Sequence, residues 1–300
     1  MRTLTHLPTE KRAYFSYCMS YLDRVFYQSA QAMTAVPDNE IDLIITSPPY
    51  FNIKDYAKNG YQTDTHSTKN KLDIGGIESY EAYIAELLVV WKECQRVLKP
   101  NGKLVINTPL MPMKKKEYDT HYNRHIFDIN SDIQQSILKN TDLFLMDVYL
   151  WNRTNPSKKL MFGSYPHPRN FYAQNTVEFL TVYVKDGKPD YALVSSERKN
   201  RSQLTEKEWI EYTKQIWDIP IPNKSDSAFG KHSAIMPEEI VFRCVRLFTF
   251  EGDVVLDPFA GSGTTLKVAK SLRRHYVGYE LYEHYRSVID AKLNNGIIVF

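Results

Sequence analysis

The chain has 300 residues, of which 43% are hydrophobic and 24% are charged, and its formal net charge is +3 at pH 7. This length allows one large domain or two small ones and can bury a sizeable core. The small positive charge permits nucleic-acid binding without demanding it. No apolar run reaches about 18 residues, and residues 1–8 lack the apolar stretch of a secretion signal. The composition therefore excludes a membrane-spanning helix, and we expect a cytoplasmic protein with no membrane partner.

The three cysteines, Cys18, Cys94 and Cys244, lie far apart in the sequence. No pair has the spacing of metal ligands, and an odd number argues against a disulfide framework. We therefore predict no metal site. Cys94 and Cys244 fall inside apolar helical patterns, so we expect them to serve packing.

The first strong signal along the chain is residues 41–46, a nearly all-apolar run that is typical of a buried parallel strand. A strand at 24–27 and a short helix at 30–35 are expected before it. The run stops at residues 47–50, Ser-Pro-Pro-Tyr, which we call the elbow. Proline cannot donate a ladder hydrogen bond, and it restricts the residue before it to an extended form. Because ligands bind at the carboxyl ends of strands in an open α/β sheet, the elbow is a candidate active site.

Helix and strand signals alternate through the middle of the chain. Apolar residues at three- and four-residue steps predict a helix over 79–98, a Lys-Pro-Asn-Gly stop follows at 99–102, and a buried strand is expected at 103–107. This order suggests a right-handed βαβ unit. Further elements are expected as a helix at 129–139 and strands at 144–151 and 176–184. Three polar stretches without a clear period, 51–78, most of 109–140, and 186–215, are expected to form loops or a small insertion.

The last quarter of the chain holds a second candidate site. A helix is expected from 237 to 248, followed by strand 254–257, a glycine-rich turn, helix 266–272, strand 275–280 and helix 285–293. A glycine-rich turn between strand and helix lets the backbone approach a ligand closely. Its spacing matches neither a P-loop nor a dinucleotide fingerprint. Glu280 ends the next strand, where an acid can accept hydrogen bonds from both ribose hydroxyls. This combination favours a nucleoside cofactor without a phosphate cradle, such as S-adenosylmethionine.

Two stretches together resemble the paired signatures of DNA amino-methyltransferases. They are Thr46-Ser47-Pro48-Pro49-Tyr50 and Asp257-Pro258-Phe259-Ala260-Gly261-Ser262-Gly263-Thr264. The elbow precedes the glycine-rich loop, which resembles the β-type circular permutation of that family. The resemblance extends to residues 52–56, 96–102, 216–220 and 232–237, and so touches most of the chain outside 1–25, 110–140 and 186–215. It implies a Rossmann-like α/β fold with a seven-stranded, mostly parallel sheet, helices on both faces, and one catalytic domain over residues 1–300.

The resemblance also implies a set of residues that bind S-adenosylmethionine. Asp257 and Phe259 would contact its methionine end, Gly261 and Gly263 would let the backbone approach it, and Glu280 would bind its ribose. Pro258, Ser262 and Thr264 complete the loop. The segment that begins at His232 would close the pocket.

At the elbow, the resemblance implies how an amine is activated. An exocyclic amine on a nucleobase is a poor nucleophile, because its lone pair is delocalised into the ring. Ser47 and the Pro48 carbonyl would accept its hydrogen bonds, Pro49 would keep the elbow stiff, and Tyr50 would stack on the base. The base must be flipped out of double-stranded DNA to reach them. In the family, serine at the first elbow position mostly accompanies cytosine-N4 methylation, so we predict that activity, with adenine-N6 methylation as the alternative.

Contacts to DNA are predicted more broadly. Candidate residues are Lys54, Lys115, Lys158, Arg169, Arg198 and Arg201. A solvated surface charge is the alternative reading of each. The insertion at 186–215 stands where the family carries target-recognition residues, and the loops at about 51–78 and 109–140 are further candidates. RNA or protein-amide methylation, and non-catalytic DNA binding, remain as other functions. A companion restriction endonuclease and a monomer or homodimer are both compatible with the sequence.

Overall fold

The structure is a computed structural model that describes residues 20–51, 72–114, 124–154, 164–170, 173–189, 191–222, 226, 228, 235–296 and 298. Its centre is a sheet of eight strands in the order β1-β10-β9-β2-β3-β7-β6-β8. These strands are β1 (Arg24–Phe26), β2 (Ile41–Thr46), β3 (Leu98–Pro109), β6 (Leu143–Arg153), β7 (Val177–Lys185), β8 (Ile216–Ile219), β9 (Val254–Asp257) and β10 (His275–Tyr279). Five neighbouring pairs are parallel and two are antiparallel. The mostly parallel sheet is confirmed, with one strand more than the seven expected.

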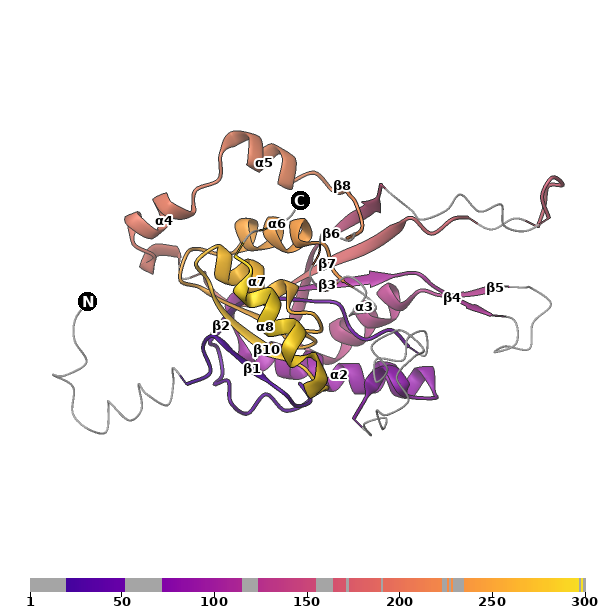
Figure 1. The fold of residues 1–300 in the computed structure, drawn as a ribbon, viewed down its shortest axis with the longest axis horizontal. Helices are drawn as coiled ribbons and strands as arrows, with labels where there is room; N and C mark the ends of the chain where they lie inside the picture. Colours follow the sequence, from indigo (N-terminus) through magenta and orange to yellow (C-terminus); the bar gives the residue numbers. More distant parts are fainter. Residues whose placement is uncertain are drawn as a thin grey trace.

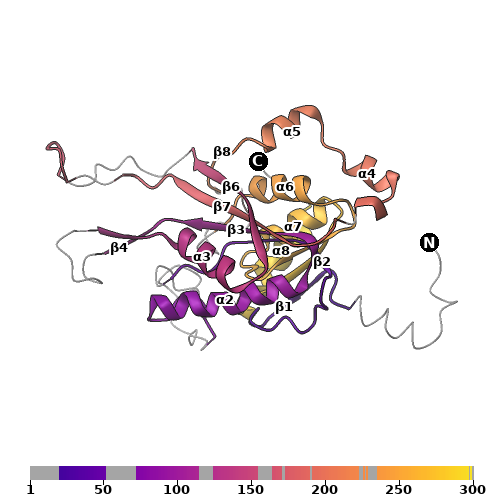
Figure 2. The ribbon, with the colours of Figure 1, turned by 180° about the vertical axis from the view of Figure 1, so that it is seen from behind.

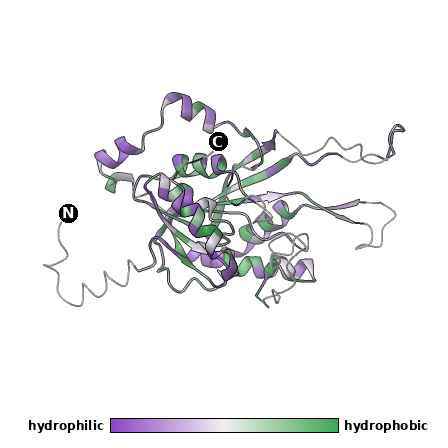
Figure 3. Ribbon diagram, viewed as in Figure 1, coloured by the Kyte–Doolittle hydropathy of each residue, from purple (hydrophilic) through white to green (hydrophobic). Residues whose placement is uncertain are grey.

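Helices cover both faces of the sheet, as expected (Figure 1; Figure 2). One face carries α2 (Tyr80–Val97) and α3 (Ile129–Asn140), and the other carries α6 (Glu238–Phe248), α7 (Thr264–Ser271) and α8 (Arg286–Asn294). Leu43 and Ile45 pack with Leu266 in one core, whereas Ile44 packs with Leu87 in the other. Successive residues of β2 point to opposite faces, and both faces are buried, so the strand is apolar at nearly every position. Hydrophobic residues, in green, accordingly lie along the central strands in Figure 3.

The connection between α2 and β3 differs from the expectation. The helix expected at 79–98 is confirmed as α2, and Ser79 caps it, with its hydroxyl accepting a hydrogen bond from the Ala82 amide. The predicted stop at 99–102 is instead part of β3, which begins directly at Leu98. Leu98 pairs with Ile41 and Lys103 pairs with Leu43, so the extra residues form a bulge. Asn101, at φ +62°, turns the chain inside that bulge.

The predicted helix at 30–35 is wrong, because these residues form turns. Arg96 of α2 donates hydrogen bonds to the carbonyls of Met33 and Val36. Those carbonyls are therefore satisfied from outside the segment, while the Met33 and Val36 side chains are buried in the core. Tertiary contacts override the local helical signal here.

Two projecting regions are more ordered than the polar sequence suggested. An antiparallel ribbon of β4 (Met111–Lys114) and β5 (Arg124–Phe127) extends from the carboxyl end of β3. The 186–215 stretch forms a 3₁₀ turn (Tyr191–Leu193) and the helices α4 (Ser196–Ser202) and α5 (Glu206–Tyr212). The ribbon and residues 164–170 between β6 and β7, which we name the β6–β7 extension, lie to one side of the molecule, and α4 lies toward the other (Figure 1; Figure 2).

The packing role predicted for Cys94 and Cys244 is confirmed. Cys94 and Cys244 are free, buried thiols inside α2 and α6, and burial raises the pKa of the Cys244 thiol to about 12. Cys18 lies outside the described residues. Among the helices that the structure describes, none is long and apolar enough to cross a membrane.

Candidate active site

The structure brings the elbow and the glycine-rich loop together at the carboxyl ends of neighbouring strands. β2 and β9 are parallel neighbours, with Ile44 beside Leu256. Just beyond this pair, the Thr46 hydroxyl donates a 2.7 Å hydrogen bond to Asp257 Oδ1. These residues are 211 positions apart in sequence. The sheet thus forms one polar edge from the two motifs, as expected from parallel strands.

Side chains of α2 hold the elbow in place. The Tyr83 hydroxyl donates a 2.9 Å hydrogen bond to the Pro49 carbonyl. The ring of Phe51 packs against Tyr80 and Tyr83 with centroid distances of 5.4 and 5.3 Å. Pro48 is buried, so the backbone of the elbow is fixed by packing as well as by proline.

Ser47 and Tyr50 face the open side of the elbow. Both side chains are partly exposed, and the Ser47 hydroxyl lies 3.4 Å from the Tyr50 hydroxyl. A hydroxyl oxygen, a fixed backbone and an aromatic ring are therefore available to a ligand at one point. This is the combination that can hold a planar ring and accept hydrogen bonds from its substituents.

Asp257 is a buried carboxyl at the junction of strand and loop. It is 5% exposed, and it accepts hydrogen bonds from Thr46 and, at 3.0 Å, from the Phe259 amide. Burial raises the pKa of Asp257 to about 6, against the lowering effect of those hydrogen bonds. The ionised form is costly in this site, so a neighbouring cation would stabilise it.

The glycine-rich loop takes a form that only glycine adopts easily. Gly261 and Gly263 have φ values of +50° and +82°. A Cβ on Gly263 would lie 3.2 Å from the side chain of Ile289 in α8. Ser262 and Thr264 are buried, with their hydroxyl oxygens 3.3 Å apart. The loop therefore turns its side chains inward and presents backbone at the start of α7.

Glu280 follows β10 and is tied to the same loop. It accepts hydrogen bonds from the Gly261 amide and the Tyr282 amide, each at 2.9 Å. The side chain is 8% exposed, and burial raises the pKa of Glu280 to about 7. Its carboxyl is thus held in place with acceptor capacity left for donors from a ligand.

The remaining predicted cofactor residues divide into described and undescribed ones. Pro258 follows Asp257 directly, and the Phe259 ring lies edge-on to Trp91 with centroids 6.1 Å apart. His232 lies outside the described residues. Its neighbours on both sides are anchored, since Asp226 contacts Lys292 of α8 and Glu238 contacts Lys267 of α7.

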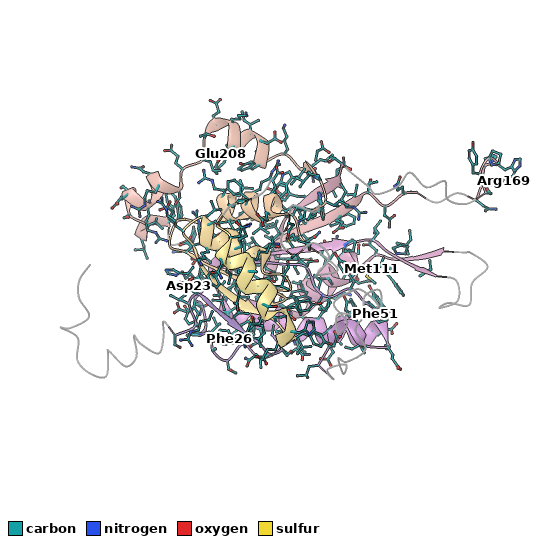
Figure 4. All side chains as sticks on the ribbon, in the orientation of Figure 1. Asp23, Phe26, Phe51, Met111, Arg169 and Glu208 are labelled. Atoms are coloured by element: carbon teal, nitrogen blue, oxygen red, sulfur yellow. The ribbon has the colours of Figure 1, made fainter. Side chains whose placement is uncertain are left out.

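The predicted DNA contacts are spread widely. Arg169 is exposed at the far end of the β6–β7 extension (Figure 4). Arg198 pairs with Asp253, and Arg201 pairs with Glu251. Both acids precede β9, at the amino end of the strand whose carboxyl end carries Asp257. The structure thus places these two arginines away from the elbow. Lys54, Lys115 and Lys158 lie outside the described residues.

Several polar residues of the site were not predicted. Asn107 lies in the strand beside the elbow, and its amide donates a 3.1 Å hydrogen bond to the buried Glu178. Arg153 lies 3.4 Å from the same carboxylate. Buried Lys292 donates to the Thr264 hydroxyl at 2.8 Å. A polar residue at the end of a predicted strand was a signal for Asn107, but an isolated lysine in an amphipathic helix gave none for Lys292.

The part of the chain that the structure describes contains no cluster of three histidine, cysteine, aspartate or glutamate side chains that could hold a metal ion. The site instead consists of two buried carboxyls, a backbone loop and the elbow.

Known proteins are similar to this chain in sequence and in fold. The chain is 27% identical over 281 residues to the type II methyltransferase M.MjaI of Methanocaldococcus jannaschii, covering 90% of each chain. It is similar to a crystal structure of TTHA0409, a putative DNA modification methylase from Thermus thermophilus, complexed with S-adenosyl-L-methionine. That match has a TM-score of 0.68 and 27% identity, covering 92% of this chain and 95% of the other. The PvuII DNA methyltransferase, described as cytosine-N4-specific, shares the fold with a TM-score of 0.61 at 19% identity, over 91% and 87% of the two chains.

The family model described as DNA methylase, N6_N4_Mtase, matches residues 41–291, which run from the first residue of β2 into α8 and include the elbow, the loop and Glu280. The chain belongs to this family of DNA methylases.

Proposed function

We propose that this protein transfers the methyl group of S-adenosylmethionine to the N4 amine of a cytosine flipped out of double-stranded DNA. The observation that carries the proposal is the hydrogen bond between Thr46 and Asp257. It holds the elbow, which would receive the base, beside the glycine-rich loop, which we propose as the cofactor loop. Ser47 favours cytosine over adenine, because the elbow resembles that of the N4 enzymes. The relative from Methanocaldococcus is named a type II methyltransferase, so a role beside a restriction endonuclease is part of the proposal.

The described residues fit S-adenosylmethionine in three respects. Asp257 is a buried acid whose ionised form gains from a nearby cation, which the ammonium and sulfonium groups would supply. Gly261 and Gly263 leave room for close approach of the backbone. Glu280 can accept hydrogen bonds from ribose hydroxyls.

The cofactor supplies an electrophilic methyl group, and the elbow prepares the nucleophile. Ser47 Oγ and the Pro48 carbonyl would accept the two N–H bonds of the exocyclic amine, which keeps the nitrogen lone pair out of the ring. Tyr50 would stack on the base and hold it in line. The amine nitrogen would form the new N–C bond as the bond between sulfur and the methyl carbon breaks, with its electron pair remaining on the sulfur of the departing S-adenosylhomocysteine, and the nitrogen would afterwards release one proton to water. Positioning and fixed dipoles therefore account for the rate, and no covalent bond to the protein is needed.

We further propose that target recognition lies on the two projections beside the elbow. The β4–β5 ribbon continues from the carboxyl end of β3, and the extension that carries Arg169 follows β6 in the chain and lies on the same side of the molecule (Figure 1; Figure 4). Both leave the sheet on the side that holds the elbow. The 186–215 insertion, which was the first candidate, has Arg198 engaged with Asp253 at the opposite end of the strands.

The test is nucleoside mass spectrometry of unmodified genomic DNA after incubation with the protein and labelled S-adenosylmethionine. We expect N4-methylcytosine. Label in N6-methyladenine would replace the cytosine assignment, and label in RNA or protein with none in DNA would overturn the proposal. Ser47→Ala and Tyr50→Ala should lower the rate at least tenfold, about 1.4 kcal/mol in activation free energy. The matched control is Ser271→Ala, at the carboxyl end of α7.

A further inference from the structure

Tyr282 joins two buried carboxyl groups that come from distant parts of the chain. Its backbone amide donates to Glu280 Oε1 at 2.9 Å, and its hydroxyl donates to Asp73 Oδ2 at 2.7 Å. Asp73 and Tyr282 are 209 positions apart, and each is 9% exposed. Tyr282 thus connects Glu280, which binds the glycine-rich loop, to the segment that leads into α2.

The second oxygen of Asp73 fixes a turn beneath the elbow. Asp73 Oδ1 accepts a 3.0 Å hydrogen bond from the Gly75 amide and caps the 3₁₀ turn η3 (Ile74–Gly76). A Cβ on Gly75 would lie 3.1 Å from Pro49 Cβ and 3.4 Å from the Tyr50 carbonyl oxygen. The turn is therefore packed directly against the elbow, and the two cannot shift independently.

A continuous path follows from these contacts. At one end, the Gly261 amide of the cofactor loop donates to Glu280 Oε2. Glu280 is linked through Tyr282 to Asp73, and Asp73 holds the turn against Pro49. Each link up to the turn is a hydrogen bond to a largely buried carboxyl group, so breaking one leaves an acceptor without that partner, and the last link is the packing of the turn against Pro49.

We propose that Tyr282 and Asp73 are positioning residues that couple the cofactor pocket to the elbow. This inference rests on the proposed function of both sites. A ligand that binds Glu280 restrains Tyr282, and through Asp73 it restrains the backbone of Pro49 and Tyr50 in the conformation that receives the base. Neither positioning residue contacts a reacting atom. They act through the elbow, and coupling of this kind is measurable as an energy between two sites.

The kinetic test uses Tyr282→Phe, which removes the hydroxyl and keeps both the ring and the amide bond to Glu280. We expect the Kd for S-adenosylmethionine, measured by calorimetry, to change less than about twofold. The initial rate at saturating cofactor and unmodified genomic DNA should fall about tenfold, equivalent to ~1.4 kcal/mol. Asp73→Asn should lower the rate as well, and the double variant should lose no more than the worse single variant, because both act through one contact.

The matched control is Tyr183→Phe. The Tyr183 hydroxyl is buried in β7 and has no hydrogen-bond partner among the residues described. Its removal deletes the same atom without touching the path, so both rate and affinity should stay within about twofold of the parent protein. Equal losses in Tyr183→Phe and Tyr282→Phe would overturn the proposal.

A second measurement does not depend on methyl transfer. Hydrogen exchange of the peptide covering residues 72–79 should slow when S-adenosylmethionine binds the parent protein or Tyr183→Phe, and should not slow in Tyr282→Phe. Equal protection in Tyr282→Phe and the parent, or a parallel loss of cofactor affinity and rate, would sink the coupling. Cofactor-dependent protection in a parent protein that methylates no DNA would support the coupling and overturn the proposed function.

Discussion

Lys267 Nζ lies 2.6 Å from Glu238 Oε1, and their side chains are only 3% and 4% exposed. The pair joins the first turn of α6 to α7, the helix that follows the glycine-rich loop. We expect Lys267→Met to lower the free energy of unfolding by about 3–5 kcal/mol, because it removes the buried ammonium that pairs with the Glu238 carboxylate. Urea unfolding at pH 7 measures this loss.

Lys214 and Glu211 supply the control for that pair. They also lie 2.6 Å apart, but their side chains are 56% and 44% exposed. Lys214→Met should change stability by less than about 1 kcal/mol. The double variant Lys267→Met/Glu238→Met should recover much of the loss, since no unpaired charge remains. Similar losses at both lysines would show that burial does not control the effect.

Asp257→Asn should raise the stability of the protein and, at the same time, weaken its binding of S-adenosylmethionine. Burial raises the folded-state pKa of Asp257 from 3.8 to about 6, so between these values the folded state holds more protons than the unfolded state. Its stability therefore falls as pH rises through this window, by about 3 kcal/mol at most. The asparagine variant has no buried carboxyl to ionise, so its stability does not fall in this window. Its gain over the parent should be large at pH 7.5 and small at pH 4, as thermal unfolding at both pH values would report.

The same variant should bind S-adenosylmethionine at least tenfold more weakly at pH 7.5, because the negative charge that would face the ligand's cationic groups is gone. Calorimetry measures this affinity. A variant that is stabilised and keeps full cofactor affinity would place the cofactor's charged end elsewhere.

Gly263 and Gly252 share a φ of +82° but differ in what surrounds them. A Cβ on Gly263 would meet Ile289 at 3.2 Å, whereas on Gly252 the nearest atom, in the Arg198 side chain, lies at 3.7 Å. Gly252→Ala should cost about 1 kcal/mol from the backbone conformation. Gly263→Ala should cost about 1–3 kcal/mol more from crowding. Denaturant unfolding of the two variants separates strain from contact, and equal costs would argue against the crowding.

Arg169 and Arg198 should behave differently toward DNA. Arg169→Ala should weaken DNA binding and make the negative slope of log K against log salt shallower by about 1, as expected for one lost phosphate contact. Arg198→Ala should leave that slope unchanged and lower stability, because its guanidinium holds Asp253 and the Glu251 carbonyl. Binding measured by fluorescence anisotropy at several salt concentrations, together with urea unfolding, tests both. A changed slope in Arg198→Ala would show that Arg198 contacts DNA and that the 186–215 insertion takes part in recognition.

The sequence predicted the strands and the turn that carry the two motifs better than it predicted the outlying structure. The strand 41–46 and the cofactor loop were readable because a central parallel strand is buried on both faces and because a tight turn needs glycine. The helix expected at 30–35 fails because Arg96, distant in sequence, takes its carbonyl groups. The buried role of Lys292 was invisible for a similar reason. Its partner Asp226 is 66 positions away, and no local pattern reveals that pairing.

The strand order has a consequence for how the chain is made. β9 lies between β10 and β2, and β10 is the strand paired with β1. During synthesis, β1 and β2 emerge long before their neighbours β10 and β9, which lie at residues 254–279. Until then the apolar edge of β2 stays open to pairing with other chains, which is a known route to aggregation. Closure of the sheet and assembly of the site are thus the same event, because the elbow and the glycine-rich loop come together only when β9 pairs with β2.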